Sequence, residues 1–341
     1  MAVMKLSDFD YYLPKALIAQ KPVSPRDHSR LMVVDRQKKK IGHRHFSDLP
    51  DYLQPGDVLV LNDTKVFPAR LIGRRQETGG KVEVFLLKPV SGNAWEALIG
   101  NRRKRIGQVI EFQKDLNCKI ISQIDDSVWL VKFNKSGNSL EKLIDQIGLT
   151  PLPPYIKAAG FKDRYQTVYA ENRGSAAAPT AGFHFTKGLI GKLKKKGVQF
   201  EFVTLHVGLG TFEPVKENDV KKHKMHSEYA LLNKATAGRL NQAKKEGRRI
   251  IAVGTTSVRT LESFNQRGKF KVGRQWTDIF IYPGYKFKAV DAMITNFHLP
   301  KSTLLMLVMA FARKELIIKA YRAAINKKYR FYSFGDAMLI I

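Results

Sequence analysis

Three histidines lie in or beside segments that are rich in glycine and hydroxyl residues: His184, His206 and His298. A histidine side chain can take up and return a proton near neutral pH, which in favourable geometry contributes ~10²–10⁴ in rate. Each histidine could instead make only a structural hydrogen bond. Proton transfer is therefore the first chemistry to consider for these segments.

His206 stands in a short apolar run, residues 202–207, that breaks into a glycine-rich turn. The run has the aromatic and β-branched character of a buried strand, and Gly208 and Gly210 permit close approach of a ligand to the backbone. A dinucleotide site is disfavoured, because Glu213 replaces the third glycine of that fingerprint and Pro214 follows where a helix should be under way. A tight turn without a ligand remains an equal alternative.

Three loops share one property, since each follows a predicted strand with small or hydroxyl residues: 208–211, 254–257 and 296–302. Ligands bind in open α/β sheets at the carboxyl ends of strands, where helix N-termini offer free N–H groups. Capping of a helix, worth ~1 kcal/mol, would explain any one loop alone. Three such loops together indicate a ligand that needs many hydrogen bonds and little charge.

The chain is strongly basic, with 59 Lys and Arg against 30 Asp and Glu among 341 residues, a formal net charge of +29. A basic proteome could account for this, but a polyanionic partner such as nucleic acid explains it more directly. Basic clusters occur at 38–40, 102–105, 194–196, 221–224 and 248–249. The run Arg102, Arg103, Lys104 and Arg105 lies between two predicted strands, and we predict that it contacts RNA phosphates.

Cysteine and histidine usage argues against a metal site. Cys118 is the only cysteine, which excludes internal disulfides and thiolate clusters. His223 and His226 have the spacing of some metal ligands, but no carboxylate completes a known signature. We expect no metal. The N-terminus lacks a signal pattern and the longest apolar run, 304–312, is too short to span a bilayer, so a cytoplasmic location is expected.

The fold class follows from the alternation of apolar segments. Strands are predicted at 31–34 and 58–61, then six short strands without helical periodicity at 69–74, 81–87, 94–99, 108–112, 119–124 and 128–133. The six form a small closed barrel in the predicted fold. Residues 67–150 are interpreted as an inserted β-barrel domain, and residues 1–66 and 151–341 as one discontinuous α/β domain.

The second half alternates strand and helix signals, which predicts a mostly parallel sheet. Helices are expected at 186–196, 236–246, from 255 onward and at 303–312, the last capped by Ser302. Strands are expected at 202–207, 249–253, 276–282 and 289–294, with a final strand at 336–341 in the same sheet.

These loops lie within motifs by which the sequence resembles the S-adenosylmethionine:tRNA ribosyltransferase-isomerases of queuosine synthesis. The resemblance runs almost end to end. Its motifs are DFDY at 8–11 with LP at 13–14, RDHSRL at 26–31, LNDTKV at 61–66, TGGK at 78–81, PLPPYI at 151–156, YQTVYA at 165–170, APTAGFHF at 178–185, TLHVGLGTF at 204–212, HSE at 226–228, AVGTTSVRTLE at 252–262, TDIF at 277–280, TNFHLPKSTLL at 295–305 and GDAM at 335–338. Leu209 and Ala158 depart mildly from the family pattern.

The resemblance implies an enzyme that uses S-adenosylmethionine as a ribosyl donor. The acceptor is 7-aminomethyl-7-deazaguanine at the wobble position of tRNA, the product is epoxyqueuosine in tRNA, and adenine and methionine leave. The partner is a tRNA with a GUN-type anticodon, and a monomer is favoured. The implied architecture is an α/β domain carrying an inserted β-barrel.

This chemistry assigns roles to particular residues. A proton beside the sulfonium is acidified by the positive sulfur, so one group could remove it and another could protonate the departing adenine. His206 and His298 are the predicted catalytic residues. Asp278 or Glu228 could help to keep the amine neutral or could form a structural ion pair. The predicted substrate-binding residues are Pro179, Thr180, Gly182, His184, Gly208, Gly210, Thr211, Thr255, Thr256, Ser257 and Asn296.

Two other functions fit parts of the sequence. A strand followed by Gly-x-Gly on a basic protein could belong to an S-adenosylmethionine-dependent RNA methyltransferase, although His206 stands where an acidic residue often ends such a strand. A barrel with a basic loop could belong to a non-catalytic RNA-binding protein.

Overall fold

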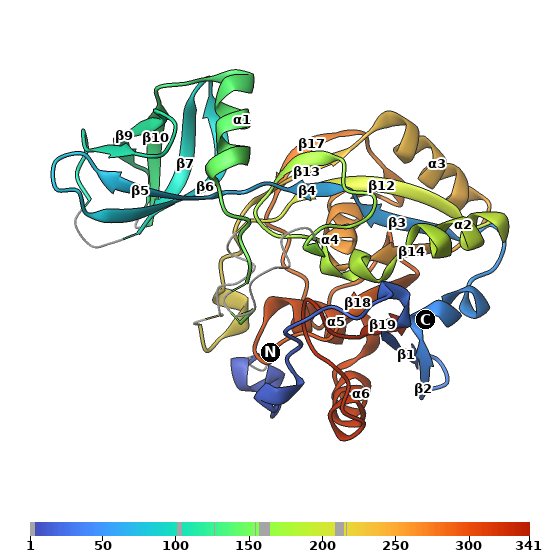
Figure 1. Ribbon diagram of the computed structural model, residues 1–341. Helices are drawn as coiled ribbons and strands as arrows, with labels where there is room; N and C mark the ends of the chain where they lie inside the picture. Colours follow the sequence, from blue (N-terminus) through green and yellow to red (C-terminus); the bar gives the residue numbers. More distant parts are fainter. Residues whose placement is uncertain are drawn as a thin grey trace. The chain divides into compact units, whose positions relative to one another are not determined.

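The computed structural model describes residues 4–100, 104–125, 127–153, 155–156, 164–208, 215 and 217–341. The chain forms two compact units, each with its own sheet (Figure 1). Unit 1 comprises Met1–Thr64, Pro154–Asn172 and Ala178–Ile341, and unit 2 comprises Lys65–Pro153 and Arg173–Ala177. The limits of the inserted domain, 67–150, remain a prediction.

Unit 1 is built on a nine-stranded mixed sheet in the order β17-β13-β12-β3-β14-β18-β19-β1-β2. Its strands are β1 Arg30–Asp35, β2 Lys40–His45, β3 Val58–Asn62, β12 Gln199–His206, β13 Glu228–Leu232, β14 Ile250–Val253, β17 Gly273–Thr277, β18 Ala292–Asn296 and β19 Ala337–Ile340. Pairing is parallel among the central strands β12, β3, β14 and β18 and between β19 and β1, and antiparallel elsewhere. The predicted final strand does join this sheet, as β19.

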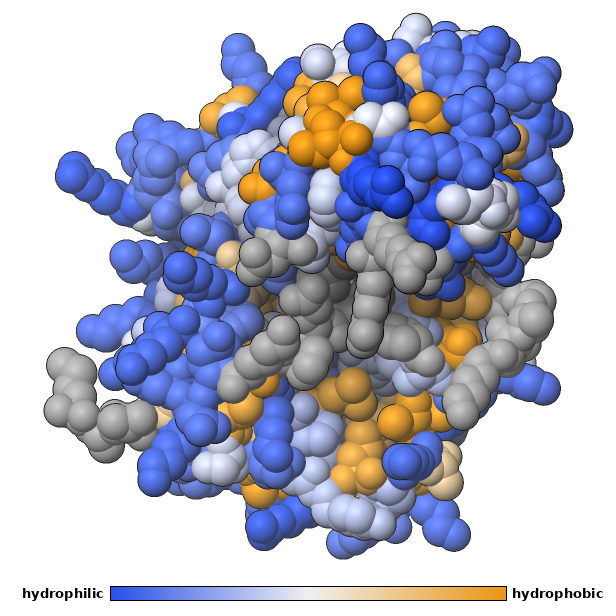
Figure 2. Space-filling model, turned by 90° about the vertical axis from the view of Figure 1, so that its left-hand side faces the viewer, coloured by the Kyte–Doolittle hydropathy of each residue, from blue (hydrophilic) through white to orange (hydrophobic). Residues whose placement is uncertain are grey.

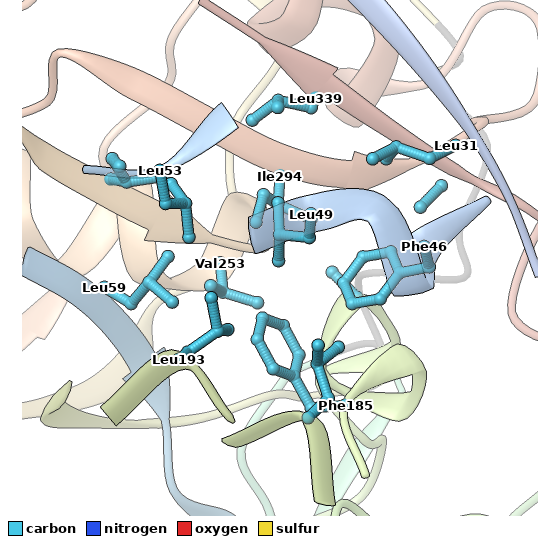
Figure 3. Close-up of a cluster of buried hydrophobic side chains, with 14 of the residues drawn as sticks. Leu31, Phe46, Leu49, Leu53, Leu59, Phe185, Leu193, Val253, Ile294 and Leu339 are labelled. Carbon is cyan, nitrogen blue, oxygen red and sulfur yellow. The ribbon is translucent and has the colours of Figure 1, made fainter. Parts of the chain in front are cut away.

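The strands β3, β14 and β18 are mostly apolar, because both faces of the sheet are covered, and polar residues stand only at the carboxyl ends of β3 and β18. Every residue of β3, β14, β18 and β19 is buried. On one face, side chains from the 3-10 helix η4 (Phe46–Tyr52) and from α2 (Lys187–Lys195) meet the strands in a single core, which includes Phe46, Leu49 and Leu193 (Figure 3). This packing fixes the strand ends that carry the polar loops.

Three helices of unit 1, α2, α3 and α5, begin at hydroxyl or amide caps, whereas α4 and α6 have no side-chain cap. Thr186 accepts from the backbone N–H of Leu189 at the start of α2, and Ser302 does the same for Leu305 at the start of α5. The other helices are α3 Lys234–Lys245, α4 Thr255–Phe264, α5 Thr303–Ala312 and α6 Lys314–Asn326. α4 packs across β12, β3 and β14.

Unit 2 contains a closed antiparallel barrel of six strands, as predicted. The strands are β5 Arg70–Arg75, β6 Lys81–Ser91, β7 Ala94–Ile99, β8 Val109–Glu111, β9 Asn117–Gln123 and β10 Val128–Phe133, followed by α1 Gly137–Ile147. Alternation of buried and exposed residues in β7 and β10 gives each strand one face in the barrel core. Two-stranded sheets are formed by β4 Thr64–Val66 with β11 Asn172–Ser175 and by β15 Asn265–Gln266 with β16 Lys269–Phe270.

Three expectations need correction. The predicted strand at 276–282 is wrong beyond Thr277, because the carbonyl groups of Thr277 and Ile279 accept hydrogen bonds from the Arg259 guanidinium. The sheet predicted as mostly parallel is mixed, with parallel pairing at its centre and between β19 and β1. Helix α6 was not predicted, although Ile317, Tyr321 and Ala324 recur on one buried face.

The face of the molecule in Figure 2 is covered mostly by hydrophilic residues, with hydrophobic residues in several small groups. Among the residues that the structure describes, no helix is both long enough and apolar enough to cross a membrane.

Candidate active site

Four strand ends come together at one edge of the sheet in unit 1. Because β12, β3, β14 and β18 run parallel, their carboxyl ends lie side by side. Those ends carry His206, Thr64, the turn into α4 and Asn296. The loops in which sequence analysis placed a ligand therefore share one edge, the position where open α/β sheets bind ligands.

His206, the last residue of β12, is half-buried at this edge. Its Nδ1 lies 2.8 Å from the Oγ1 atom of Thr64, and its ring stacks on Tyr229 with centroids 5.7 Å apart. Burial lowers the pKa of His206 to about 4, so the imidazole is neutral at pH 7. A neutral imidazole can accept a proton at its unprotonated ring nitrogen.

A polar network behind His206 ties the end of β3 to β12. Asp63 accepts hydrogen bonds from Thr204 Oγ1 at 2.7 Å and Asn172 Nδ2 at 2.9 Å, and burial raises the pKa of its carboxyl. Asn62 Oδ1 accepts the backbone N–H of Leu205 at 3.1 Å while its Nδ2 donates to the carbonyl of the same residue at 3.0 Å. The network orients the loop that holds Thr64 against His206.

His184 is buried and belongs to a second polar network. Its Nδ1 lies 2.7 Å from Ser29 Oγ and its Nε2 lies 3.2 Å from Asn296 Nδ2, while Thr180 Oγ1 donates to Asn296 Oδ1 at 3.2 Å. The ring stacks on Phe46 at 5.0 Å. Burial lowers the pKa of His184 to about 3, and the charges of Arg330 and Arg26 make smaller contributions in the same direction. With both ring nitrogens engaged, His184 serves to position Asn296.

His298 is also enclosed. Its Nε2 lies 2.9 Å from Thr295 Oγ1, its backbone N–H donates to Tyr321 at 3.0 Å, and its carbonyl accepts from the hydroxyl of Tyr11. Burial lowers its pKa to about 3. Of the two predicted catalytic histidines, His206 is the one with a partly exposed ring.

The turn from β14 into α4 approaches the segment 179–185 closely. Gly254, at φ +88°, precedes Thr255, and a Cβ on Gly254 would lie 3.5 Å from the Cβ of Ala181. Ser257 Oγ donates to the carbonyl of Val253 at 2.8 Å, so its hydroxyl caps the strand end. Among the described residues, the buried Thr256 Oγ1 in the first turn of α4 has no hydrogen-bond partner.

An ion pair holds the start of the glycine-rich turn. Glu228 Oε1 accepts the backbone N–H of Gly208 at 3.0 Å, and Glu228 Oε2 pairs with Arg259 Nη1. The side chains are 5% and 7% exposed, so the pair is buried. Glu228 therefore acts through the backbone of Gly208, two residues after His206.

The structure leaves several predicted site residues untested. Arg102, Arg103, Gly210 and Thr211 lie outside the described residues. In unit 2 the ammonium of Lys104 lies 5.8 Å from the ring centroid of Trp129, and Arg105 is exposed. Their contact with RNA remains a prediction. The described residues contain no group of three His, Cys, Asp or Glu side chains placed to hold a metal ion.

Sequence reasoning missed Thr64 and Arg259 as parts of this edge. Thr64 follows a fully buried strand, and Arg259 lies one helical turn after the predicted loop at 254–257. The detectable signal was the placement of polar residues directly after apolar strands in the motifs at 61–66 and 252–262. Which partners these side chains find depends on packing between elements distant in sequence.

Gly182→Ala should destabilise unit 1 by about 1 to 3 kcal/mol, because a methyl group there would lie 1.9 Å from the hydroxyl of Tyr169 and 2.8 Å from Thr167 Cγ2. Urea unfolding measures the change. Gly191→Ala in α2 is the matched control: no atom lies within 4 Å of its added Cβ, so it should raise stability by about 0.4 to 1 kcal/mol. Equal stability of the two variants would contradict the close packing at Gly182.

Acid should destabilise the protein through its buried histidines. The pKa of His184 and of His298 is lowered to about 3, so the unfolded chain binds more protons than the folded chain below pH 6.5. Stability is fully present above that pH and is lost as the pH falls toward 3. Urea unfolding near pH 5 should show His184→Asn reducing the pH slope by about 1.4 kcal/mol per pH unit. An unchanged slope would contradict the lowered pKa.

Known proteins match this chain over almost its full length. Residues 6–340 match the family model described as queuosine biosynthesis protein. The S-adenosylmethionine:tRNA ribosyltransferase-isomerase of Thermoanaerobacter sp. (strain X514) is 54% identical over 99% of this chain and 100% of that protein, and the one of Staphylococcus aureus (strain JH9) is 52% identical over the same shares.

A solved structure gives the same family. The crystal structure of S-adenosylmethionine tRNA ribosyltransferase from Thermotoga maritima is 40% identical in sequence, with a TM-score of 0.58, over 98% of this chain and 100% of that chain. The chain belongs to the queuosine biosynthesis protein family.

Proposed function

We propose that this protein is an S-adenosylmethionine:tRNA ribosyltransferase-isomerase. It transfers the ribosyl moiety of S-adenosylmethionine onto the 7-aminomethyl-7-deazaguanine base at the tRNA wobble position and isomerises it, giving epoxyqueuosine in tRNA plus adenine and methionine. The observation that carries this proposal is identity of 54% with a relative of that name over the whole chain. The strand-end edge with His206 supports it as the place of reaction.

His206 is the proposed base. The positive sulfur acidifies the adjacent carbon, and a neutral imidazole at the edge of the sheet can accept that proton. Because burial lowers the pKa of His206 to about 4, its protonated form is a stronger acid than an ordinary imidazolium and can return the proton to the departing adenine. His298, with a pKa of about 3 and an enclosed ring, is proposed to hold the loop at 296–302 in place.

S-adenosylmethionine is the co-substrate, and its adenosine carries no phosphate. The proposed contacts are accordingly neutral hydrogen-bonding groups, and one of them is Thr256 Oγ1, which has no partner within the described part of the chain. Thr180 and Asn296 are joined by a hydrogen bond and shape the adjoining wall. The tRNA partner is proposed to carry a GUN-type anticodon, the protein to act as a monomer, and its location to be the cytoplasm.

The test is incubation of the protein with S-adenosylmethionine and tRNA bearing the aminomethyl base. Chromatography should show adenine and methionine released in equal amounts, with the ribosyl carbons retained in tRNA. Release of S-adenosylhomocysteine would identify a methyltransferase. Binding of RNA with no saturable binding of S-adenosylmethionine in calorimetry would identify a passive RNA-binding protein.

A further inference from the structure

A basic hollow lies at the edge of the nine-stranded sheet, beside β2 and the end of α6. It is lined by Arg30, His43, Arg44, His45, Asp48, Lys327 and Tyr329. Five of these side chains are arginine, lysine or histidine, and a single carboxylate, Asp48, is among them. Neither the candidate active site nor the loop at 102–105 includes any of these residues.

The floor of the basic hollow is rigidly built. Tyr329 is 1% exposed, and its hydroxyl lies 2.9 Å from His43 Nδ1. The Arg30 guanidinium lies 4.0 Å above the centroid of the tyrosine ring, donates to the carbonyl of Lys327 at 2.8 Å and pairs with Asp336 at 3.3 Å. These contacts hold one positive charge in a defined place without exposing an apolar surface.

The rim supplies cations that the described part of the chain does not neutralise. Arg44 and Lys327 are exposed, and neither forms an ion pair with a carboxylate among the described residues. Arg44 donates to the carbonyl of His43 at 2.8 Å. Asp48 accepts the backbone N–H of His45 at 3.0 Å, which engages the one carboxylate of the lining.

Three positive charges of the lining act on His43. The pKa of His43 is lowered first by burial and then by the charges of Lys327, Arg30 and Arg44. Charged residues also keep an edge strand such as β2 from pairing with other sheets, and a lysine after a helix C-terminus is favourable. The first effect explains Arg44 and the second explains Lys327. Neither effect explains why Arg30, Arg44 and Lys327, from separate elements, line one concave site.

We propose that the basic hollow binds backbone phosphates of the RNA substrate. The inference rests on the proposed function, which makes tRNA the partner. RNA presents closely spaced phosphates, and the two exposed cations at the rim can neutralise them beside the fixed guanidinium of Arg30. A membrane surface fits less well, because the lining offers no exposed aliphatic or aromatic side chain to insert among lipids.

The test is the double variant Arg44→Ala with Lys327→Ala in the full-length protein, using an unmodified tRNA transcript as the probe. The slope of log affinity against log salt should flatten by roughly 1.4 to 1.8, which is ~0.7 to 0.9 for each lost phosphate contact. Turnover at saturating tRNA should stay within twofold of wild type while KM for tRNA rises.

The control is Lys195→Ala with Lys245→Ala, which removes the same charge from exposed positions on α2 and α3. Its salt slope should match that of wild type. Equal slopes for the two double variants would overturn the proposal, as would loss of binding to anionic lipid vesicles with unchanged tRNA affinity. Absence of adenine release by the wild-type protein would instead count against the proposed function.

Discussion

Arg259→Met should lower the free energy of unfolding by about 3 to 5 kcal/mol, the largest stability change that we expect in this chain. The substitution leaves the Glu228 carboxylate buried and without its cation, and an uncompensated buried charge is costly. The backbone carbonyls of Thr277 and Ile279 would also lose their donor. Urea unfolding of the variant measures the effect.

A second substitution separates the effect of breaking the Arg259–Glu228 ion pair from the effect of losing the Arg259 side chain. Arg259→Met with Glu228→Gln removes both charges and should recover a large part of the loss, because no buried charge remains. Lys314→Met breaks the exposed pair with Asp8 and should cost no more than about 1 kcal/mol. If Arg259→Met is as mild as Lys314→Met, the pair does not stabilise the end of β12.

His206→Ala should reduce the rate of adenine release by ~10² to 10⁴, the contribution expected of a proton-transferring group. The dissociation constant of S-adenosylmethionine should change much less, about threefold or below, because His206 is proposed to act on the reacting carbon. Single-turnover release of adenine and calorimetry with S-adenosylmethionine give the two values.

Thr64→Val is the matched control for His206. It removes the partner that lies 2.8 Å from Nδ1 but keeps the imidazole, so its rate should fall by a smaller factor, about tenfold. If His206→Ala weakens S-adenosylmethionine binding as much as it lowers the rate, His206 is a binding residue and the proposed base must be sought elsewhere.

Much of this architecture could be predicted because its signals are local. The strands at 94–99 and 128–133 show the alternation of a barrel wall, and the start of α5 at Thr303 follows from the cap at Ser302. The apolar run at 58–61 indicated a buried strand, and β3 is one of the central strands whose carboxyl ends carry the site.

Other features depend on contacts between distant residues, which local patterns do not contain. The sequence of β13 does not by itself identify β13 as the partner of β12. The segment after Thr277 was wrongly predicted as a strand, since the sequence does not show that the carbonyl group of Ile279 bonds Arg259. The sequence offered His206 and His298 as catalytic residues and His184 as a substrate-binding residue. Only tertiary packing separates the enclosed rings of His184 and His298 from the half-buried ring of His206.

The side chain of Asn62 fixes the register between β3 and β12 at this site. Its side-chain amide bonds both backbone groups of Leu205, so it continues the pairing of β3 with β12 past the last main-chain partner, Val203 opposite Asn62. A slip of one residue between these strands would turn every following side chain of β12 to the opposite face of the sheet. By locking that alignment, one buried amide determines on which side of the sheet the imidazole of His206 emerges.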